Sequence, residues 1–330
     1  MTERATENAA TTENAATTEK GATTEDAATA EDGPAAGTGT GAENAAKPTP
    51  AADGGTPGYR SGATLPFRAE LRRQLRRRRT ALAFALVVAL PLLLVAAFTW
   101  GSGDGGGLPS FGALATSGGA NFTVFTLATA AALLLNLIVA LVCGDAVAGE
   151  AGWGSLRYLL AVPVPRARLL GVKLAVGLAT STVALLVLAV TALAVGTAAF
   201  GWHPLRTPRG DELPPMDALW RIAVMVGYLA VCLLLVAALA FWFSVRTDAP
   251  LVAVGGAVLV MIVANILDAV EALGGIRSVL PMHYATAWRG LFTDPLQWED
   301  LAKGSLSSLA YTAVFLGLAW WTFLRKDVLS

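Results

Sequence analysis

Long apolar runs alternate with short polar connections along most of the chain. A helix needs roughly 20 apolar residues to cross about 30 Å of hydrocarbon, and six runs reach that length. They are Thr80–Trp100, Phe122–Gly144, Leu174–Phe200, Arg221–Phe243, Pro250–Asp268 and Ser305–Leu324. The pattern predicts an all-α integral membrane protein whose residues 81–330 form one domain of six transmembrane helices.

The first 62 residues have a different pattern. They repeat an approximate unit, ATENAATTENAATTEKGATTEDAATAED, and nearly lack large aliphatic and aromatic side chains. Such a segment cannot bury enough apolar surface to offset the entropy lost on ordering its backbone. Residues 1–62 are therefore predicted to be a disordered, acidic, low-complexity tail.

The stretch between this tail and the first apolar run, TLPFRAELRRQLRRRRT, is strongly basic. Phe67, Leu71 and Leu75 recur at every fourth position, and arginines occupy the rest of the helical surface. This pattern predicts an amphipathic interfacial helix over residues 63–80, with its stripe at the acyl boundary of the bilayer and its arginines on anionic headgroups. The alternative is a basic segment that only fixes the orientation of the first span.

Lysine and arginine are unequally distributed between the two ends of the spans. They cluster before the first span, between the second and third, and after the sixth, whereas the connection between the first and second spans has none. Cytoplasmic loops carry the excess of lysine and arginine. A multi-pass protein of the cell (plasma) membrane is therefore predicted, with both termini in the cytoplasm.

The chain carries no P-loop motif, no H-E-x-x-H and no G-x-S-x-G. Cys143 and Cys232 each lie within an apolar run, and we interpret them as small packed hydrophobic residues in preference to a redox pair or metal ligands. No metal site, catalytic residue or nucleic-acid partner is expected. An intramembrane enzyme would need several ionisable residues at bilayer depth, which these runs hardly contain.

Two asparagines, Asn136 and Asn265, are the main polar residues inside the apolar runs. One interpretation is an interhelical hydrogen bond, and the other is a place on a translocation path. The residues alone leave both open.

A long, charged connection, GEAGWGSLRYLLAVPVPRARLLGVK, joins the second and third apolar runs (Gly149–Lys173). It resembles the signature E-x-x-x-G-[ST]-L-R-x-L-L-x-x-P-[VI]-x-R-x-x-L-L-x-x-K, which follows the second span in permease subunits of ABC exporters of the type-2 class. The C-terminal FLRKDV also resembles the usual ending of that family. The matching positions of the signature are Glu150, Gly154, Ser155, Leu156, Arg157, Leu159, Leu160, Pro163, Val164, Arg166, Leu169, Leu170 and Lys173.

The resemblance implies a non-catalytic subunit that couples ATP hydrolysis by a separate ATPase subunit to export. It implies dimerisation with a second permease copy or a paralogue, and it places ATP and magnesium on the partner, with no cofactor bound by this chain. The segment Ala272–Phe292 would correspond to short helices outside the membrane. The residues expected at the ATPase-coupling interface are Glu150, Gly154, Ser155, Leu156, Arg157, Pro163 and Arg166.

Within that segment, Glu150, Arg157 and Arg166 are candidates for holding either the ATPase surface or each other. An alternative function is a multi-span membrane scaffold or regulatory protein that recruits partners through its cytoplasmic tail. The sequence does not identify a substrate.

Overall fold

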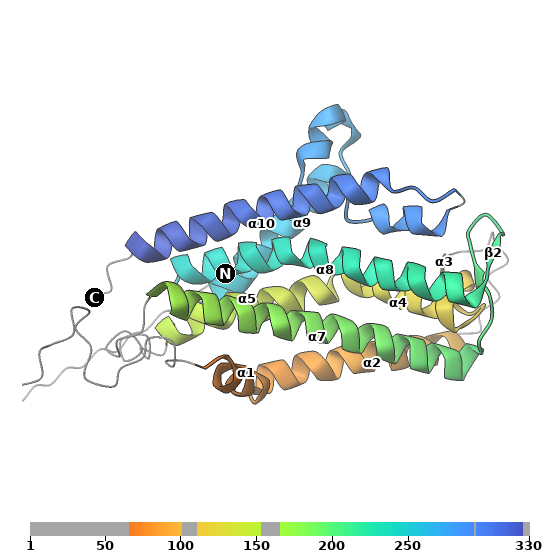
Figure 1. The fold of residues 1–330 in the computed structure, drawn as a ribbon, viewed down its shortest axis with the longest axis horizontal. Coiled ribbons are helices and arrows are strands. Elements are labelled where there is room, and N and C mark those ends of the chain that lie inside the picture. The colour runs from red at the N-terminus through yellow and green to blue at the C-terminus, as the bar shows by residue number, and fades with distance from the viewer. Residues whose placement is uncertain (1–65, 101–110, 153–165, 294, 326–330) are drawn as a thin grey trace, which may run out of the picture. The chain divides into compact units, whose positions relative to one another are not determined.

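The computed structural model describes residues 66–100, 111–152, 166–293 and 295–325, all of which belong to one compact unit. Within that unit, long helices lie side by side (Figure 1). The α-helices are α1 (Phe67–Leu75), α2 (Arg78–Trp100), α3 (Phe111–Ala115), α4 (Gly119–Ala132), α5 (Leu134–Gly152), α7 (Arg166–Phe200), α8 (Pro215–Arg246), α9 (Pro250–Asp268) and α10 (Glu299–Arg325). Two 3₁₀ helices are η2 (Glu271–Val279) and η3 (Ala287–Phe292). The predicted tail lies outside the described residues.

Among the described residues, six helices are long and apolar enough to cross a membrane: α2, α5, α7, α8, α9 and α10. The predicted all-α membrane architecture is thereby confirmed. The helix over Pro250–Asp268 has the bounds that the apolar run predicts. In contrast, α7 and α8 extend beyond the predicted spans, and α7 with its 35 residues includes Lys173.

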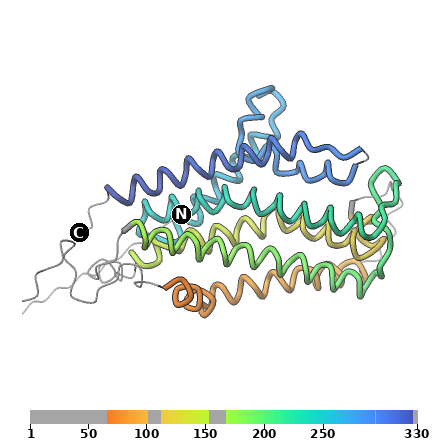
Figure 2. The backbone as a smooth tube through the Cα atoms, viewed as in Figure 1, coloured from red at the N-terminus to blue at the C-terminus, as the bar shows by residue number. Residues whose placement is uncertain are grey.

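Helix α8 forms the centre of the bundle and packs against α5, α7, α9 and α10. The tube in Figure 2 shows α5, α7 and α8 running alongside one another. The segment Leu235–Phe241 of α8 is buried at every position, and its alanines allow the neighbouring helices to approach closely. The core of the unit therefore lies around the middle of α8.

The predicted second span, Phe122–Gly144, is wrong as a single helix, because the chain breaks between α4 and α5. Leu133 leaves the helical region, with φ −143° and ψ −53°. The side chain of Asn136 donates from Nδ2 to the carbonyl oxygen of Ala131 at 3.0 Å, across the break. The segment around the break contains neither glycine nor proline, so the sequence pattern gave no sign of it.

The connections between α7 and α8 and between α9 and α10 contain short secondary-structure elements that the sequence predicts only in part. An antiparallel hairpin, β1 (Leu205–Arg206) with β2 (Glu212–Leu213), joins α7 to α8, and Gly210 in its turn has φ +94°. This hairpin was not predicted. The short helices expected over Ala272–Phe292 are present as η2 and η3.

Candidate functional site

Helix α1 turns its polar face, not its apolar stripe, toward the other helices. Its buried residues are Glu70 and Gln74. Two residues of the predicted stripe face outward, with Phe67 40% and Leu75 46% exposed, and the third, Leu71, is partly buried. The helix is shorter than the predicted 63–80, because the chain turns at Arg76 before α2 begins. An outward apolar stripe is what an interfacial helix would present to a bilayer, and that contact stays a prediction.

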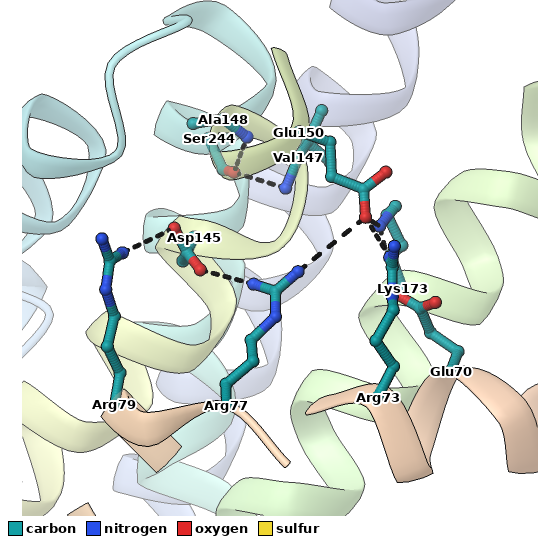
Figure 3. Close-up of polar contacts among 10 residues, drawn as sticks. All are labelled: Glu70, Arg73, Arg77, Arg79, Asp145, Val147, Ala148, Glu150, Lys173 and Ser244. Carbon is teal, nitrogen blue, oxygen red and sulfur yellow. Dashed lines mark hydrogen bonds and ion pairs between the residues drawn. The ribbon is translucent and has the colours of Figure 1, made fainter. Parts of the chain in front are cut away.

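Buried acids of α1 and α5 meet arginines of the basic segment around α1 and a lysine of α7 at one end of the bundle (Figure 3). We call this group the α1 ion-pair cluster. Its members are Glu70, Arg73, Arg77, Arg79, Asp145, Glu150 and Lys173. It joins α1 and the start of α2 to the end of α5 and the start of α7.

One half of the cluster is organised by Lys173. Its Nζ donates to Glu150 Oε1 at 2.7 Å and to Glu70 Oε1 at 3.2 Å. Arg73 donates to the same two carboxylates and lies 2.7 Å from Glu70 Oε1. Two cations thus bridge two carboxylates, which connects α1, α5 and α7 through one set of contacts.

The other half is organised by Asp145, which precedes Glu150 on α5 by about 1.4 helical turns. Arg77 Nη1 donates to Asp145 Oδ2 at 2.6 Å, and Arg79 Nη1 donates to Asp145 Oδ1 at 3.0 Å. Arg77 Nη2 also lies 3.9 Å from Glu150 Oε1, so it connects the two halves. The start of α2 is therefore bound to α5, the helix that α1 also contacts.

The contribution of each ion pair in the cluster to stability depends on how far its side chains are buried. The side chains of Lys173 and Glu150 are only 2% and 3% exposed, whereas Arg73 and Arg79 remain about half exposed. A surface ion pair contributes little to stability, but removal of one partner from a buried pair leaves an uncompensated charge and costs about 3–5 kcal/mol. The buried members should therefore fix the relative positions of their helices.

The acid on α1 is held in its charged form. Burial would raise the pKa of the Glu70 carboxyl, but hydrogen bonds and attraction from Arg73 and Lys173 outweigh burial and hold the pKa below its ordinary value. The carboxylates of Glu70 and Glu150 raise the pKa of Arg73, although the burial of Arg73 opposes that shift. Glu70 is consequently ionised at neutral pH.

Two features of α5 position its acids. Ser244 on α8 is fully buried, and its Oγ accepts hydrogen bonds from the backbone nitrogens of Val147 at 3.0 Å and Ala148 at 2.9 Å. The carboxylate of Asp145 folds over Gly149, where an added Cβ would lie 2.6 Å from Asp145 Oδ1. Glycine at this position therefore leaves the space that the carboxylate needs.

The structure brings only part of the predicted coupling set together. Glu150 lies in the cluster, and its carboxylate reaches α1 and α7. Gly154, Ser155, Leu156, Arg157 and Pro163 lie outside the described residues, as does the side chain of Arg166 at the start of α7. The role of these residues at an ATPase interface stays a prediction.

The sequence interpretation missed most of the cluster as a site. Glu70, Arg73, Arg77 and Asp145 were not singled out, and Lys173 was noted only as the end of the signature. A usable signal was present, because Asp145 and Glu150 are acids at the end of an apolar run that is followed by basic residues. An acid at the end of a span needs a cationic partner, and the densest basic run of the sequence lies before the first span.

Asn136 and Asn265 line one small cavity of about 30 Å³, between α5, α8 and α9. Asn265 Nδ2 donates to the carbonyl oxygen of Met261 in its own helix at 2.8 Å. Asn136 instead bonds across the α4–α5 break. In this structure each amide therefore satisfies a backbone carbonyl, and no asparagine-to-asparagine hydrogen bond is recorded among the described residues.

Comparison of the sequence with known protein families gives a match. A family model described as ABC-2 family transporter protein matches residues 67–265. The matched region begins at the first residue of α1, includes the whole α1 ion-pair cluster and the Gly149–Lys173 segment, and ends within α9. No curated protein matches the chain.

Proposed function

Because the chain belongs to the ABC-2 transporter family, it is the permease component of an ABC transporter in a membrane, and we propose that it couples ATP hydrolysis by a separate ATPase subunit to export. The geometry of the α1 ion-pair cluster supports this proposal. A permease subunit needs no catalytic chemistry of its own. What it needs is a rigid connection between the surface that the ATPase moves and the helices that enclose the path.

The observation that carries the proposal is the ion pair between the two ends of the signature segment. Glu150 is the last acid of α5 and Lys173 lies in the first part of α7, and their side chains meet at 2.7 Å. The end of α5 and the first part of α7, which flank the signature segment, are therefore joined at one buried point. A force applied to this segment would reach α5 and α7 together, and Arg73 would pass it to α1.

ATP binding to the partner can shift the permease only if the partner contacts its two conformations differently. We propose that the ATPase subunit, which would hold ATP and magnesium, binds the 149–173 segment and the exposed side of α1. Displacement of that segment would then move α5 and α7 relative to the other helices. The cluster is the part of this chain that makes the displacement a movement of whole helices.

The outward surfaces of the spans are apolar and need to be covered by two further partners. On α9, Leu251, Leu259 and Ile266 are 84%, 61% and 60% exposed. Such a surface is stable only against lipid or another protein. We propose that the bilayer covers part of it and that a second permease copy or a paralogue covers the rest, in the plasma membrane with both termini in the cytoplasm.

Affinity purification from the native membrane in a mild detergent, followed by mass spectrometry, tests the proposal. The full chain should bring down an ABC ATPase in stoichiometric amount. Arg157→Ala combined with Arg166→Ala should reduce that recovery, whereas Arg206→Ala with Lys303→Ala, at the other end of the bundle, should not. Loss of the complex on deletion of residues 1–60, with recovery unaffected by the paired arginine variant, would favour a recruiting tail instead.

A further inference from the structure

A cavity of about 410 Å³ lies at the end of the bundle opposite to the α1 ion-pair cluster. Residues of α3, α4, the β1–β2 hairpin and η3 line it. We call it the hairpin cavity. Its volume falls within the range of about 300–1,000 Å³ that is typical of small-molecule sites.

The interior of the hairpin cavity is apolar and its rim is cationic. The buried side chains of Val124, Leu205, Trp288 and Phe292 contribute to its lining. Exposed arginines at positions 206, 209 and 289 line it as well. Among the described residues, no carboxylate lines it, so the positive charge is not neutralised from within.

Two of these arginines have no acidic partner among the described residues, namely Arg209 and Arg289. Arg289 lies over the ring of Trp288, with 5.7 Å between the guanidinium carbon and the ring centre. Arg206 pairs through Nε with Glu212 at 3.1 Å, but both side chains are more than half exposed. An exposed pair of this kind contributes little and is easily exchanged for another anion.

Hydrogen bonds from distant residues hold both walls of the cavity in place. The Asn121 side chain donates from Nδ2 to the carbonyl oxygen of Arg206 at 2.7 Å and accepts from the Arg206 nitrogen at 2.9 Å, which fixes the hairpin on α4. Arg221, buried on α8, donates to the carbonyl oxygens of Leu291 at 2.7 Å and Thr293 at 3.4 Å. The cavity is thus built by the fold, and a ligand would not have to order it.

We propose that the hairpin cavity binds an amphipathic anion, with an apolar chain among Val124, Trp288 and Phe292 and a phosphate or carboxylate head on Arg209 and Arg289. Apolar lining favours a hydrocarbon chain because binding removes the chain from water. Guanidinium groups bind phosphate and carboxylate through paired N–H donors. The site rests on this geometry and not on the transport function proposed above.

The test is a binding titration of the purified full-length chain in phosphatidylcholine nanodiscs by native mass spectrometry. Palmitoyl lysophosphatidylglycerol is the anionic probe, and palmitoyl lysophosphatidylcholine is the zwitterionic probe with the same chain. The anionic probe should bind more tightly. Arg209→Gln combined with Arg289→Gln should weaken it by about tenfold or more.

Leu114→Glu, which places a carboxylate on the wall of the cavity, should weaken the anionic probe similarly. The matched control is Lys303→Gln, which removes an exposed cation at the same end of the bundle and should change nothing. Equal binding of both probes, unchanged by the arginine variants, would overturn the proposal. Repeating the titration in nanodiscs with phosphatidylglycerol identifies the source of the anion. Weaker binding of the probe would show that a bilayer lipid competes for the cavity. Unchanged binding would indicate that the ligand is a free amphiphile.

Discussion

Glu150 and Lys173 stand 23 residues apart in the chain, yet Lys173 Nζ lies 2.7 Å from Glu150 Oε1, and both side chains are almost completely buried. They are also the acid and the lysine at the two ends of the segment that resembles the type-2 exporter signature. The ion pair therefore joins α5 to α7 at the two ends of that segment.

The first prediction concerns the stability of this pair. Lys173→Met removes the cation from two buried carboxylates, Glu150 and Glu70, and should lower the free energy of unfolding by about 3 kcal/mol. Adding Glu150→Gln should recover part of the loss, because one of the uncompensated charges is removed. Thermal unfolding of the purified chain in one detergent measures both changes.

Lys303→Met is the matched control, because its pair with Glu299 is exposed and should contribute less than about 1 kcal/mol. An equal effect of the two methionine variants would contradict the buried role of Lys173.

The second prediction concerns Gly149. A Cβ at this position would lie 2.6 Å from Asp145 Oδ1, so Gly149→Ala should push the carboxylate away from Arg77 and Arg79 and destabilise the chain by about 1–3 kcal/mol. Gly171→Ala on α7 is the control, since an added Cβ there meets nothing within 4 Å. Alanine is favoured over glycine inside a helix by about 1 kcal/mol, so the control should be neutral or slightly stabilising. The melting temperature should fall in Gly149→Ala and should stay the same or rise slightly in Gly171→Ala.

The third prediction concerns pH. The pKa of Glu70 is lower in the folded chain than its ordinary value of 4.5, so its contribution to stability is fully present above pH 4.5. The contribution should be lost as the pH falls through the folded pKa. Distances between spin labels on α1 and α7 should therefore stay constant from neutral pH down to about 4.5 and lengthen below it.

Arg73→Gln removes one of the groups that lower the pKa of Glu70, so the transition should move to higher pH in that variant. A transition at the same pH in both proteins would show that Arg73 does not hold Glu70.

The fourth prediction separates the two asparagines. Asn136→Leu removes the donor that satisfies the Ala131 carbonyl at the α4–α5 break and should lower the free energy of unfolding by about 1 kcal/mol. Asn265→Leu should cost less, because its amide bonds a carbonyl of its own continuous helix. If Asn136→Leu changes the ATPase rate of the assembled complex without changing its melting temperature, the residue acts on the translocation path and not as a structural contact.

The sequence pattern predicts the membrane architecture well because a span needs a length and a composition that few other segments have. It fails at the α4–α5 break, where Leu133 departs from helical geometry inside an uninterrupted apolar run. A side chain three residues later, Asn136, stabilises the break, and its partner could not be inferred from spacing alone. The hairpin near Arg206 was missed because its strands contain only two residues each.

The sequence predicted some residues of the candidate site but not the contacts between them. The resemblance identified Glu150 and Lys173 as matching positions, but nothing in it placed them in contact. The partners Arg73 and Arg77 are 77 and 68 residues from the α5 carboxylates that they contact, and a basic run before a span has an orientation role that explains it without any ion pair. The packing of α1 on α7, together with the ion pairs from this region to α5, was needed to show which arginines are used.

The measurement that tests the account most directly is the ATPase rate of the complex, reconstituted in proteoliposomes with its partner ATPase. Wild type, Glu150→Gln, Lys173→Met and the double variant are compared, each with assembly verified by co-purification. Both single variants should assemble but hydrolyse ATP more slowly, and the double variant should not be slower than Lys173→Met alone, because both substitutions break the same link. Wild-type rates in both single variants would contradict the account, since the Glu150–Lys173 pair would then carry no part of the coupling.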